Sequence, residues 1–429
     1  MKDPVAIILA AGRGTRMKSE KPKVLHKILG KPIIRYVLDS VKEAGVRDAV
    51  LVAGYGNALL KDEIDDAKIV VQKELLGSGD AVNTAKKLLE GFSGDVLVVC
   101  GDTPLIRAET IKGLLNKHKL SGASVTILTA KLSDPTGYGR IARGESGAVT
   151  GIVEQINASL YEEVIDEINV GTYCFKAEEL FEALEAVKPD IKKKEFFLTD
   201  TIGILKNKGK LVESYLTEDP DEAIGVNTRM DLAYSTTVLK NRVAQELMAL
   251  GVTIEDPSST VIYPGAKIGK DTIIHSNTVI ESDVEIGENC HIGPFARIRP
   301  KVYIGDNVEV GNFVELNRST IGSDSKVKHH TYLGDATLGK KVNIGAGTIT
   351  ANYDGKNKNK TIIGDGAFIG VGAILIAPLK IGAMSMVGAG SVVPKNHDVP
   401  KGEIVVGVPA RIYKKRKAAD RRNKNNRRG

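Results

Sequence analysis

A glycine-rich loop with basic side chains is the first segment whose residue types could do chemistry. It follows an apolar stretch and reads Leu9-Ala10-Ala11-Gly12-Arg13-Gly14-Thr15-Arg16-Met17. Backbone N–H groups in a loop of this kind can cradle a phosphate or contact the edge of a base. Arg13, Arg16 and the nearby Lys23 add positive charge suited to a triphosphate and a leaving pyrophosphate. Met17 stands where a dinucleotide fingerprint needs its third glycine, and no Gly-Lys-Ser/Thr sequence follows, so neither that motif nor a P-loop is present.

A carboxylate follows another apolar stretch. Asp102 comes just after the strand expected at 96–100, in Gly101-Asp102-Thr103-Pro104-Leu105. Ligands of open α/β sheets bind beyond the carboxyl ends of the strands, and Mg²⁺ is a hard cation that prefers oxygen ligands. Asp102 is therefore a candidate Mg²⁺ ligand. The alternative is a simple turn residue before Thr-Pro.

Two adjacent histidines form the third candidate group. His329 and His330 lie in Lys328-His329-His330-Thr331-Tyr332-Leu333-Gly334-Asp335. A neutral imidazole can accept a proton near neutral pH. A surface histidine by itself usually has no chemical role, so the surrounding sequence has to decide between the two interpretations.

Alternating strands and helices must position the first two groups. Strands are expected at Val5–Ala10, Ala49–Ala53, Lys68–Gln72, Asp95–Cys100 and Ser124–Ala130, with helices such as Ile33–Ala44 and Ser78–Leu89 between them. Strands separated by helices predict a mostly parallel sheet covered on both faces.

A period of six residues positions the histidines. Aliphatic residues recur at Ile262, Ile268, Ile274, Ile280, Ile286, Ile292, Ile298, Ile304, Val310 and Leu316, and again at Ile363, Ile369, Leu375, Ile381, Val387 and Val393. This period differs from the 3.6 of a helix and predicts short strands that coil into a parallel β-helix over residues 260–393. Steps are shorter near Ile321 and Leu338, and a loop is expected over Thr350–Lys360.

These patterns predict four segments. Residues 1–227 form the first domain, 228–250 a linker helix, 251–413 the β-helix domain and 414–429 a basic, disordered tail. Leu232, Leu239, Val243, Leu247 and Leu250 recur at helical spacing in the linker, which indicates packing rather than a ligand site.

Charge and cysteine content narrow the class of protein. The 429 residues carry a net charge of +7, but the last 16 have nine Lys/Arg and one Asp, a net +8, which leaves −1 for the rest. The basic charge is thus confined to the tail, for which contact with an anionic surface or RNA is the alternative to a solvated extension. The three cysteines are widely spaced and lack the spacing of metal ligands. The sequence shows neither a signal peptide nor a membrane-spanning run, so we expect a cytoplasmic protein.

The loop LxAGxGTRM followed by Pro22-Lys23, together with the hexads, resembles two families joined in one chain: the sugar-phosphate nucleotidyltransferases and the hexapeptide-repeat acyltransferases. The resemblance covers residues 5 to about 410. It implies an α/β nucleotidyltransferase domain with a Rossmann-like mixed, mostly parallel sheet, followed by a left-handed parallel β-helix that forms homotrimers. It also implies acetyl transfer from acetyl-CoA to glucosamine-1-phosphate, then uridylyl transfer from UTP to N-acetylglucosamine-1-phosphate with Mg²⁺. Small-molecule substrates are expected, and neither a membrane nor nucleic acid.

The resemblance also implies roles for residues of the first domain. UTP and its uracil are expected at Leu9, Ala10, Ala11, Gly12, Lys23, Gln72, Gly77 and Ser78. The sugar is expected at Gly139, Glu154, Asn169 and Asn227. Asp102 and Asn227 are implied as the Mg²⁺ ligands, and Lys23 and Arg16 as the catalytic cations.

In the β-helix, the resemblance implies that His329 is the base of acetyl transfer. Glucosamine-1-phosphate is expected at Arg299, Asn317, Tyr332 and Asn343. Acetyl-CoA is expected at Ala346, Asn352, Tyr353, Lys358, Val371 and Ala389. Two positions depart from the family pattern: Asn317 stands where a phosphate-binding Lys is usual, and Val371-Gly372 replaces a Ser-Asp pair. Arg318 could substitute for the Lys, although neighbours on a strand face opposite ways.

Two other functions remain open from the sequence. The chain could be a nucleotidyltransferase only, with the β-helix as a trimerisation scaffold or acting on a different acyl donor or sugar. It could also bind anionic surfaces through its basic tail.

Overall fold

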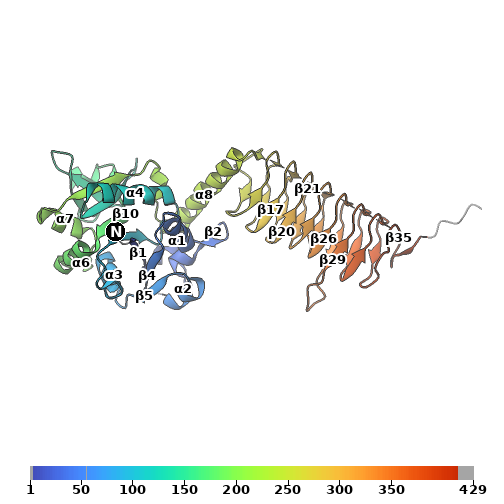
Figure 1. Ribbon diagram of the computed structural model, residues 1–429, viewed down its shortest axis with the longest axis horizontal. Coiled ribbons are helices and arrows are strands. Elements are labelled where there is room, and N and C mark those ends of the chain that lie inside the picture. Colours follow the sequence, from blue (N-terminus) through green and yellow to red (C-terminus); the bar gives the residue numbers. More distant parts are fainter. Residues whose placement is uncertain (1–2, 55, 414–429) are drawn as a thin grey trace, which may run out of the picture. The chain divides into compact units, whose positions relative to one another are not determined.

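The computed structural model describes residues 3–54 and 56–413, which divide into two compact units, Met1–Leu239 and Lys240–Gly429 (Figure 1). Each unit is described by itself. The predicted tail at 414–429 lies outside the described residues. Within the described ranges, no helix is long and apolar enough to cross a membrane, and Cys100, Cys174 and Cys290 are free thiols.

The first unit is built on one mixed sheet whose main path runs β11-β7-β10-β6-β1-β4-β5. Its strands are β1 Val5–Ala10, β4 Asp48–Ala53, β5 Lys68–Val71, β6 Asp95–Cys100, β7 Val125–Lys131, β8 Arg140–Arg143, β9 Val149–Val153, β10 Glu167–Lys176 and β11 Val212–Leu216. β1, β4, β5 and β6 are parallel, as the alternation of strands and helices predicted, whereas β10 runs antiparallel between β6 and β7. A separate hairpin pairs β2 Lys27–Ile28 with β3 Lys31–Pro32.

Helices cover both faces of this sheet. They are α1 Ile33–Glu43, α2 Asn57–Glu63, α3 Ser78–Thr84, α4 Ala108–Ser121, α5 Leu160–Glu163, α6 Ala177–Ala186 and α7 Asp200–Asn207, with short 3₁₀ helices at Thr15–Met17, Lys23–Leu25, Lys86–Leu89 and Pro220–Ala223. Side chains alternate along β6, so Val98 packs with α3, α6 and α7 while Leu97 packs with α1 and α4. The helix expected at Ser78–Leu89 is two pieces, because the N–H of Ala85 bonds to the carbonyl of Val82 and tightens the turn there.

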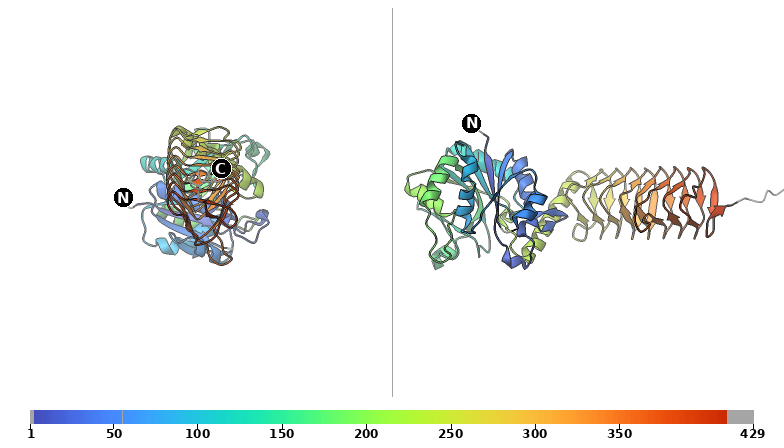
Figure 2. Two further views of the ribbon diagram at one scale, coloured as in Figure 1. Left: turned by 90° about the vertical axis from the view of Figure 1, so that its right-hand side faces the viewer. Right: turned by 90° about the horizontal axis from the view of Figure 1, so that it is seen from below.

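The second unit is a left-handed parallel β-helix, made of three sheets of short strands (Figure 2). The hexads predicted the parallel β-helix, and the family resemblance implied its left hand. One sheet contains β12 Thr253–Ile254, β15 Ile273–Ile274, β18 His291–Ile292, β21 Glu309–Asn312, β24 Lys326–His329, β27 Asn343–Ile344, β30 Phe368–Ile369, β33 Met386–Val387, β35 Ile404–Val406 and β36 Arg411–Ile412. The next contains β13 Val261–Ile262, β16 Val279–Ile280, β19 Arg297–Ile298, β22 Glu315–Asn317, β25 Tyr332–Gly334, β28 Ile349–Ala351, β31 Ile374–Ile376 and β34 Val392–Val393. The third contains β14 Lys267–Ile268, β17 Val284–Ile286, β20 Val302–Ile304, β23 Thr320–Ile321, β26 Ala336–Leu338, β29 Thr361–Ile363 and β32 Leu379–Ile381.

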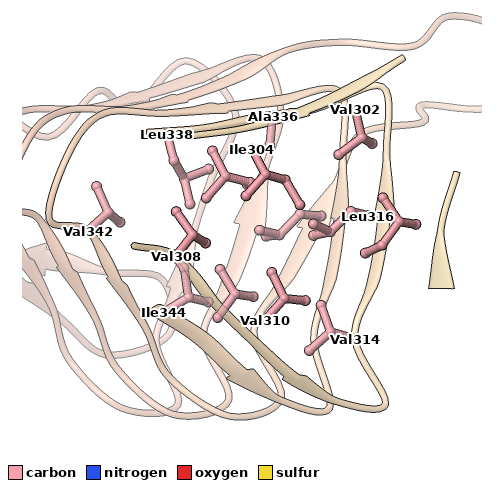
Figure 3. Packing of buried hydrophobic residues seen from close by; sticks show 14 of the residues in the cluster. Val302, Ile304, Val308, Val310, Val314, Leu316, Ala336, Leu338, Val342 and Ile344 are labelled. Carbon is pink, nitrogen blue, oxygen red and sulfur yellow. The ribbon is translucent and has the colours of Figure 1, made fainter. Parts of the chain in front are cut away.

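The hexad residues form the core of this β-helix. All ten aliphatics from Ile262 to Leu316 are buried, and Figure 3 shows Ile304, Val310 and Leu316 pointing into the interior. In the regular coils Ile274 pairs with Ile292, eighteen residues later. Near the histidines the coil is one residue shorter, and Leu316 pairs with Leu333, seventeen residues later. The strands therefore still pair in register, and it is the turn at one corner that is one residue shorter.

Two expectations for the second half were wrong in detail. Thr350 belongs to β28 and is fully buried, so the loop begins only at Asn352. The Thr350 hydroxyl accepts a hydrogen bond from Gly334 N at 2.8 Å, which lets a polar residue take a hexad position. Leu250 is 70% exposed, because the linker helix α8 Arg229–Ala249 ends before it. Leu247 does pack on the β-helix core, together with Ala244.

Candidate functional sites

A cavity of about 850 Å³ lies at the carboxyl ends of β1, β5 and β6. Its lining consists of Leu9, Ala10, Ala11, Gly12, Arg13, Lys23, Val24, Gln72, Lys73, Glu74, Leu75, Gly77, Ser78, Ala81, Cys100, Asp102 and Glu195. The eight residues predicted to contact UTP are all in this set, and so is Asp102. The structure thus brings together residues from positions 9 to 195 of the sequence in one hollow.

The glycine-rich loop approaches Lys23 closely. Gly14 has φ +61°, and a Cβ added there would lie 2.7 Å from the Cβ of Lys23. Glycine lets the backbone take this left-handed conformation and leaves room for the lysine. Arg13 lines the cavity, whereas the predicted catalytic Arg16 is exposed on the short helix after the loop and is not in the lining.

Lys23, Asp102 and Asn227 converge at the edge of the cavity. Lys23 Nζ forms a salt bridge with the Asp102 carboxylate and donates to Asn227 Oδ1 at 2.9 Å. The Lys23 side chain is only 12% exposed, and that of Asp102 is 22% exposed. The backbone holds this arrangement, since Val226 N donates to the carbonyl of Asp102 at 2.8 Å.

The same two oxygen-bearing side chains fit a divalent cation. The carboxylate of Asp102 and the amide oxygen of Asn227 already point at one positive charge, the ammonium of Lys23. Both are oxygen donors of the kind that Mg²⁺ prefers. Asp102 and Asn227 could therefore hold Mg²⁺ if Lys23 Nζ moves aside.

The predicted uracil side of the cavity is fixed by a short network. Gln72 Nε2 donates to the carbonyl of Gly77 at 3.1 Å and to Asp80 Oδ2 at 2.7 Å. Both amide hydrogens are thereby used, and the amide oxygen remains as an acceptor. Gly77 has φ +106°, and an added Cβ would meet Phe196 O at 2.6 Å, so this turn requires glycine.

Three of the four residues predicted to contact the sugar, Gly139, Glu154 and Asn169, lie on β8, β9 and β10 or just beside them, whereas Asn227 lies beside Lys23 and Asp102. Asn169 N donates to the carbonyl of Gly139 at 2.9 Å, and Asn169 Nδ2 donates to the Tyr173 hydroxyl at 2.7 Å. Glu154 Oε1 accepts from Thr199 Oγ1 at 2.8 Å. The structure thus brings Gly139 and Asn169 together, although neither they nor Glu154 line the 850 Å³ cavity.

The partly buried thiol of Cys100 lies close enough to Asp102, Lys23 and Glu154 for their charges to affect its pKa. Burial, together with the smaller effects of the Asp102 and Glu154 carboxylates, raises the pKa of Cys100 to about 12, and Lys23 opposes this rise. Burial also raises the pKa of Tyr173, with smaller effects from Cys100 and Glu154 in the same direction. Cys100 therefore stays a neutral thiol on the cavity wall rather than a thiolate nucleophile.

A second cavity, of about 490 Å³, surrounds His329 on the β-helix. It is lined by His275, His291, Gly293, Pro294, Glu309, Val310, Gly311, Asn312, Lys328 and His329. His329 Nδ1 lies 2.9 Å from Asn312 Oδ1, one coil away in direct register. Because an amide oxygen only accepts, Nδ1 carries the hydrogen and Nε2 has a free lone pair. This is the tautomer that a base acting through Nε2 needs.

His330 has a different environment. Its ring stacks on Phe313 with centroids 5.0 Å apart, and Phe313 stacks on Phe295 at 5.3 Å. These three rings form a ladder along one corner of the β-helix. The adjacent histidines thus separate into one that faces a cavity and one that packs on aromatic neighbours.

Three of the predicted acetyl-CoA residues share a corner column with His329. Ile344 pairs with Ile369, and Ile369 with Val387, so Ala346, Val371 and Ala389 occupy equivalent positions in successive coils. Val327 pairs with Ile344, which adds His329 to the same column. Their neighbouring backbones are in contact, since Gly372 N donates to Ala346 O and Gly390 N to Val371 O, both at 2.7 Å.

The phosphate candidates lie on the sheet that contains β19, β22 and β25. Arg299 Nη1 donates to Glu315 Oε1 at 2.9 Å, and the buried Arg299 Nε has no hydrogen-bond partner among the described residues. Glu315 also pairs in register with Tyr332. The Arg299 guanidinium is therefore oriented by Glu315 while its side chain stays 38% exposed.

At the shortened corner, Arg318 and Asn317 do not face opposite ways. Arg318 has φ +49°, so strand alternation stops there, and its Nη1 donates to Asn317 Oδ1 at 2.9 Å. The same guanidinium makes two hydrogen bonds to Asp335, at 2.7 and 2.8 Å. Asp335 also accepts from Asn352 Nδ2 at 2.5 Å, which brings this predicted acetyl-CoA residue to the corner. The hydrogen bonds from Arg318 hold the pKa of Asp335 below its usual value.

The remaining candidates are more scattered. Tyr353 is 62% exposed and bridges to Lys358 within the loop. Asn343 lies on β27, in register with Lys326 and Phe368. Among the predicted acetyl-transfer residues, only His329 lines the 490 Å³ cavity, so a single chain does not gather the set around one hollow.

Comparison with known proteins finds a family match in each half of the chain. Residues 5–221 match the nucleotidyl transferase family, and residues 283–318 match the bacterial transferase hexapeptide (six repeats) family. The chain is 44% identical to the bifunctional protein GlmU of Shouchella clausii (strain KSM-K16), with 96% of this chain and 98% of the relative covered. The chain belongs to the bifunctional GlmU family. GlmU of Heliobacterium modesticaldum (strain ATCC 51547 / Ice1) is 42% identical, with 95% of this chain and 96% of the relative covered.

A solved structure of apo UDP-glucose pyrophosphorylase matches at a TM-score of 0.48 and 19% identity, covering 57% of this chain and all of that one. The similarity to GlmU proteins covers more of the chain, because it extends over both units.

In this GlmU-family chain, sequence reasoning missed several residues of the candidate sites. Asp80 orients Gln72, and Asn312 orients His329. Glu195 enters the nucleotide cavity from a loop before α7, and Cys100 forms part of its wall. The position of Cys100 could have been predicted from the sequence, since it ends the strand that precedes Asp102. Glu195 and Asn312 lie far along the sequence from the groups they join, and no local motif marks them.

Proposed function

We propose that this chain is a bifunctional enzyme of UDP-N-acetylglucosamine synthesis. The β-helix domain acetylates glucosamine-1-phosphate with acetyl-CoA, and the nucleotidyltransferase domain joins the product to UTP and releases pyrophosphate. The observation that carries the proposal is the 850 Å³ cavity, where the glycine-rich loop, Gln72, Lys23 and Asp102 meet in a chain of the GlmU family. The domains are proposed to span 1–227 and 251–413, joined by a helix at 228–250.

Uridylyl transfer needs positioning and charge rather than a base. A phosphate oxygen of N-acetylglucosamine-1-phosphate, already anionic, attacks the α-phosphorus of UTP, and the bond to the pyrophosphate oxygen breaks. The loop amides and Arg13 bind the triphosphate, and Lys23 neutralises charge on the leaving group once it releases Asp102. Mg²⁺ held by Asp102 and Asn227 would supply further positive charge at the phosphate oxygens. The Gln72 amide oxygen is suited to accept the uracil N3–H.

Acetyl transfer needs a base, and His329 has the arrangement for one. The neutral amine of glucosamine-1-phosphate attacks the thioester carbonyl and His329 Nε2 takes a proton from the amine. The C–S bond then breaks, and the leaving sulfur receives that proton from His329, so that coenzyme A departs as a thiol. Asn312 keeps the hydrogen on Nδ1 so that Nε2 is available. Arg299 is suited to the sugar phosphate because its side chain is 38% exposed and Glu315 orients its guanidinium through Nη1.

We further propose that the enzyme is a homotrimer through its β-helix, with acetyl-transfer sites between neighbouring prisms. Support comes from the placement of Arg299 and Tyr332 on one face of the prism and of Asn343 on another. We place the enzyme in the cytoplasm, where its three thiols would stay reduced.

The test is a substrate panel with the purified full-length chain. Pyrophosphate release is measured with UTP or dTTP and either N-acetylglucosamine-1-phosphate or glucosamine-1-phosphate, and thiol release with acetyl-CoA and the same sugars. We expect pyrophosphate from UTP with the acetylated sugar, and coenzyme A only with the free amino sugar. Pyrophosphate without any thiol release would make the β-helix a scaffold, and absence of both products would overturn the proposal.

A further inference from the structure

Three side chains with the donor atoms of a metal site meet in the first unit, away from the nucleotide cavity. The ligand atoms of Asp95, His118 and Cys174 all lie within 4.8 Å of one another, and this is the only such group among residues 3–54 and 56–413. Asp95 begins β6, His118 lies in the last turn of α4, and Cys174 is on β10. Cys174 pairs in register with Leu97 of β6 and with Thr126 of β7. Two adjoining strands and a covering helix therefore each contribute one donor.

His118 is aimed into this cluster and lacks a partner there. Its side chain is 2% exposed, and its Nε2 makes no hydrogen bond within the described part of the chain. Nδ1 lies 3.0 Å from Thr126 Oγ1, which can accept the Nδ1 hydrogen. Nε2 then presents a lone pair toward Asp95 Oδ1, 3.5 Å away. Metal-ligating histidines usually donate their other ring N–H to an oxygen in this way.

The cluster is separate from the proposed catalytic site. Asp95 and Cys100 are the two ends of β6, and the rise of about 3.3 Å per residue places them roughly 16 Å apart. The nucleotide cavity has Cys100 in its wall but none of Asp95, His118 or Cys174. A cation bound at the far end of the strand would not meet the reacting phosphates.

We propose that Asp95, His118 and Cys174 form a binding site for a borderline divalent cation of the Zn²⁺ type. One carboxylate oxygen, one imidazole nitrogen and one thiolate sulfur suit Zn²⁺, whereas Mg²⁺ prefers oxygen alone. Tetrahedral ligation at about 2.0–2.3 Å puts ligand atoms about 3.3–3.8 Å apart, which the 3.5 Å separation of His118 and Asp95 already matches. Cys174 would move inward by about 1 Å and release its proton to solvent on binding.

The fourth position is open to water. The Asp95 side chain is 38% exposed while His118 and Cys174 are buried, so a cation and its water would enter past Asp95. Bound metal would connect β6, β10 and α4 and stabilise the fold of the first unit. The competing explanation is a buried His–Asp pair beside an inert thiol, which would retain no metal.

Co²⁺ in place of Zn²⁺ tests the proposal, because a cobalt–thiolate bond gives a charge-transfer absorption that carboxylate and imidazole ligands lack. The full-length chain is stripped with chelator, given excess Mg²⁺ to occupy the oxygen sites, and titrated with Co²⁺ under reducing conditions. The same titration is done with Cys174→Ser and, as matched controls, with Cys290→Ser in the β-helix and Cys100→Ser in the nucleotide cavity. Circular dichroism checks that each variant folds.

We expect about one thiolate-bound Co²⁺ per chain, displaced by Zn²⁺, in the wild type and both controls, and loss of the thiolate band in Cys174→Ser. If Cys174→Ser does not fold, Asp95→Asn at the partly exposed position should weaken Co²⁺ affinity roughly tenfold or more. The wild type should also melt at a higher temperature with Zn²⁺ than without it. Absence of a thiolate band in the wild type would overturn the proposal, as would its persistence in Cys174→Ser or its loss only in Cys100→Ser.

Discussion

Replacing Asn312 by alanine should slow acetyl transfer without affecting uridylyl transfer. Asn312 Oδ1 lies 2.9 Å from His329 Nδ1 and determines which ring nitrogen carries the hydrogen. A neutral hydrogen bond of this kind contributes about 0.5–1.5 kcal/mol, and about 1.4 kcal/mol is a factor of ten. We therefore expect kcat for acetyl transfer to fall roughly 2- to 13-fold. KM for glucosamine-1-phosphate should change little, because Asn312 acts through His329.

The aspartate variant tests the same contact through pH. A carboxylate at position 312 would stabilise the protonated imidazole, which cannot act as a base. The base must be neutral to act, so the acid limb of the rate profile should move to higher pH.

The assay is thiol release from acetyl-CoA between pH 5 and 9, with pyrophosphate release from the same preparations as internal control. Asn307→Gly is the matched variant, since the Asn307 amide reaches Asp324 at 3.3 Å instead of a histidine and its φ of +58° tolerates glycine. The reasoning would be refuted by an unchanged kcat in Asn312→Ala. An equal loss in Asn307→Gly, or a fall in both activities together, would refute it as well.

Three further predictions follow from other contacts. Gly77→Ala places a Cβ 2.6 Å from Phe196 O, so it should lose more uridylyl activity and melt lower than Gly91→Ala, whose φ is also positive but whose Cβ meets nothing within 4 Å. Asp335 has its folded pKa depressed by Arg318, so its pairing stabilises the fold above the unfolded pKa of about 3.9 and is lost as pH falls through the folded value. Asp335→Asn should therefore cost about 1–2 kcal/mol at pH 7 and progressively less below about pH 4 in thermal melts; a constant difference would contradict this. Chelation of Mg²⁺ should abolish pyrophosphate release and leave thiol release intact; equal loss of both would contradict the assignment of the metal to Asp102 and Asn227.

The sequence predicted most of the architecture because both halves of the chain follow simple hydrophobic patterns. One inward side chain in six defines a β-helix coil, and apolar strands between helices define a covered sheet. The start of the loop was mispredicted because a polar side chain occupies a core position there. Thr350 takes a core position by satisfying its hydroxyl with Gly334, which a search for aliphatic residues misses.

The candidate sites were less predictable. Gln72 and Lys23 lie in recognisable local motifs, and both line the nucleotide cavity. Asn312 reaches His329 only because a coil of seventeen residues places them side by side, and this register depends on the shortened corner at Arg318. Contacts of that kind depend on the three-dimensional path of the chain rather than on a motif.

The central claim is that two separate sites on one chain catalyse two reactions. Asp102→Ala and His329→Ala, each assayed for both pyrophosphate and thiol release in the full-length protein, test it most directly. We expect Asp102→Ala to abolish uridylyl transfer and keep acetyl transfer, and His329→Ala to do the reverse. Uridylyl transfer that persists in Asp102→Ala, or acetyl transfer that persists in His329→Ala, would contradict the account.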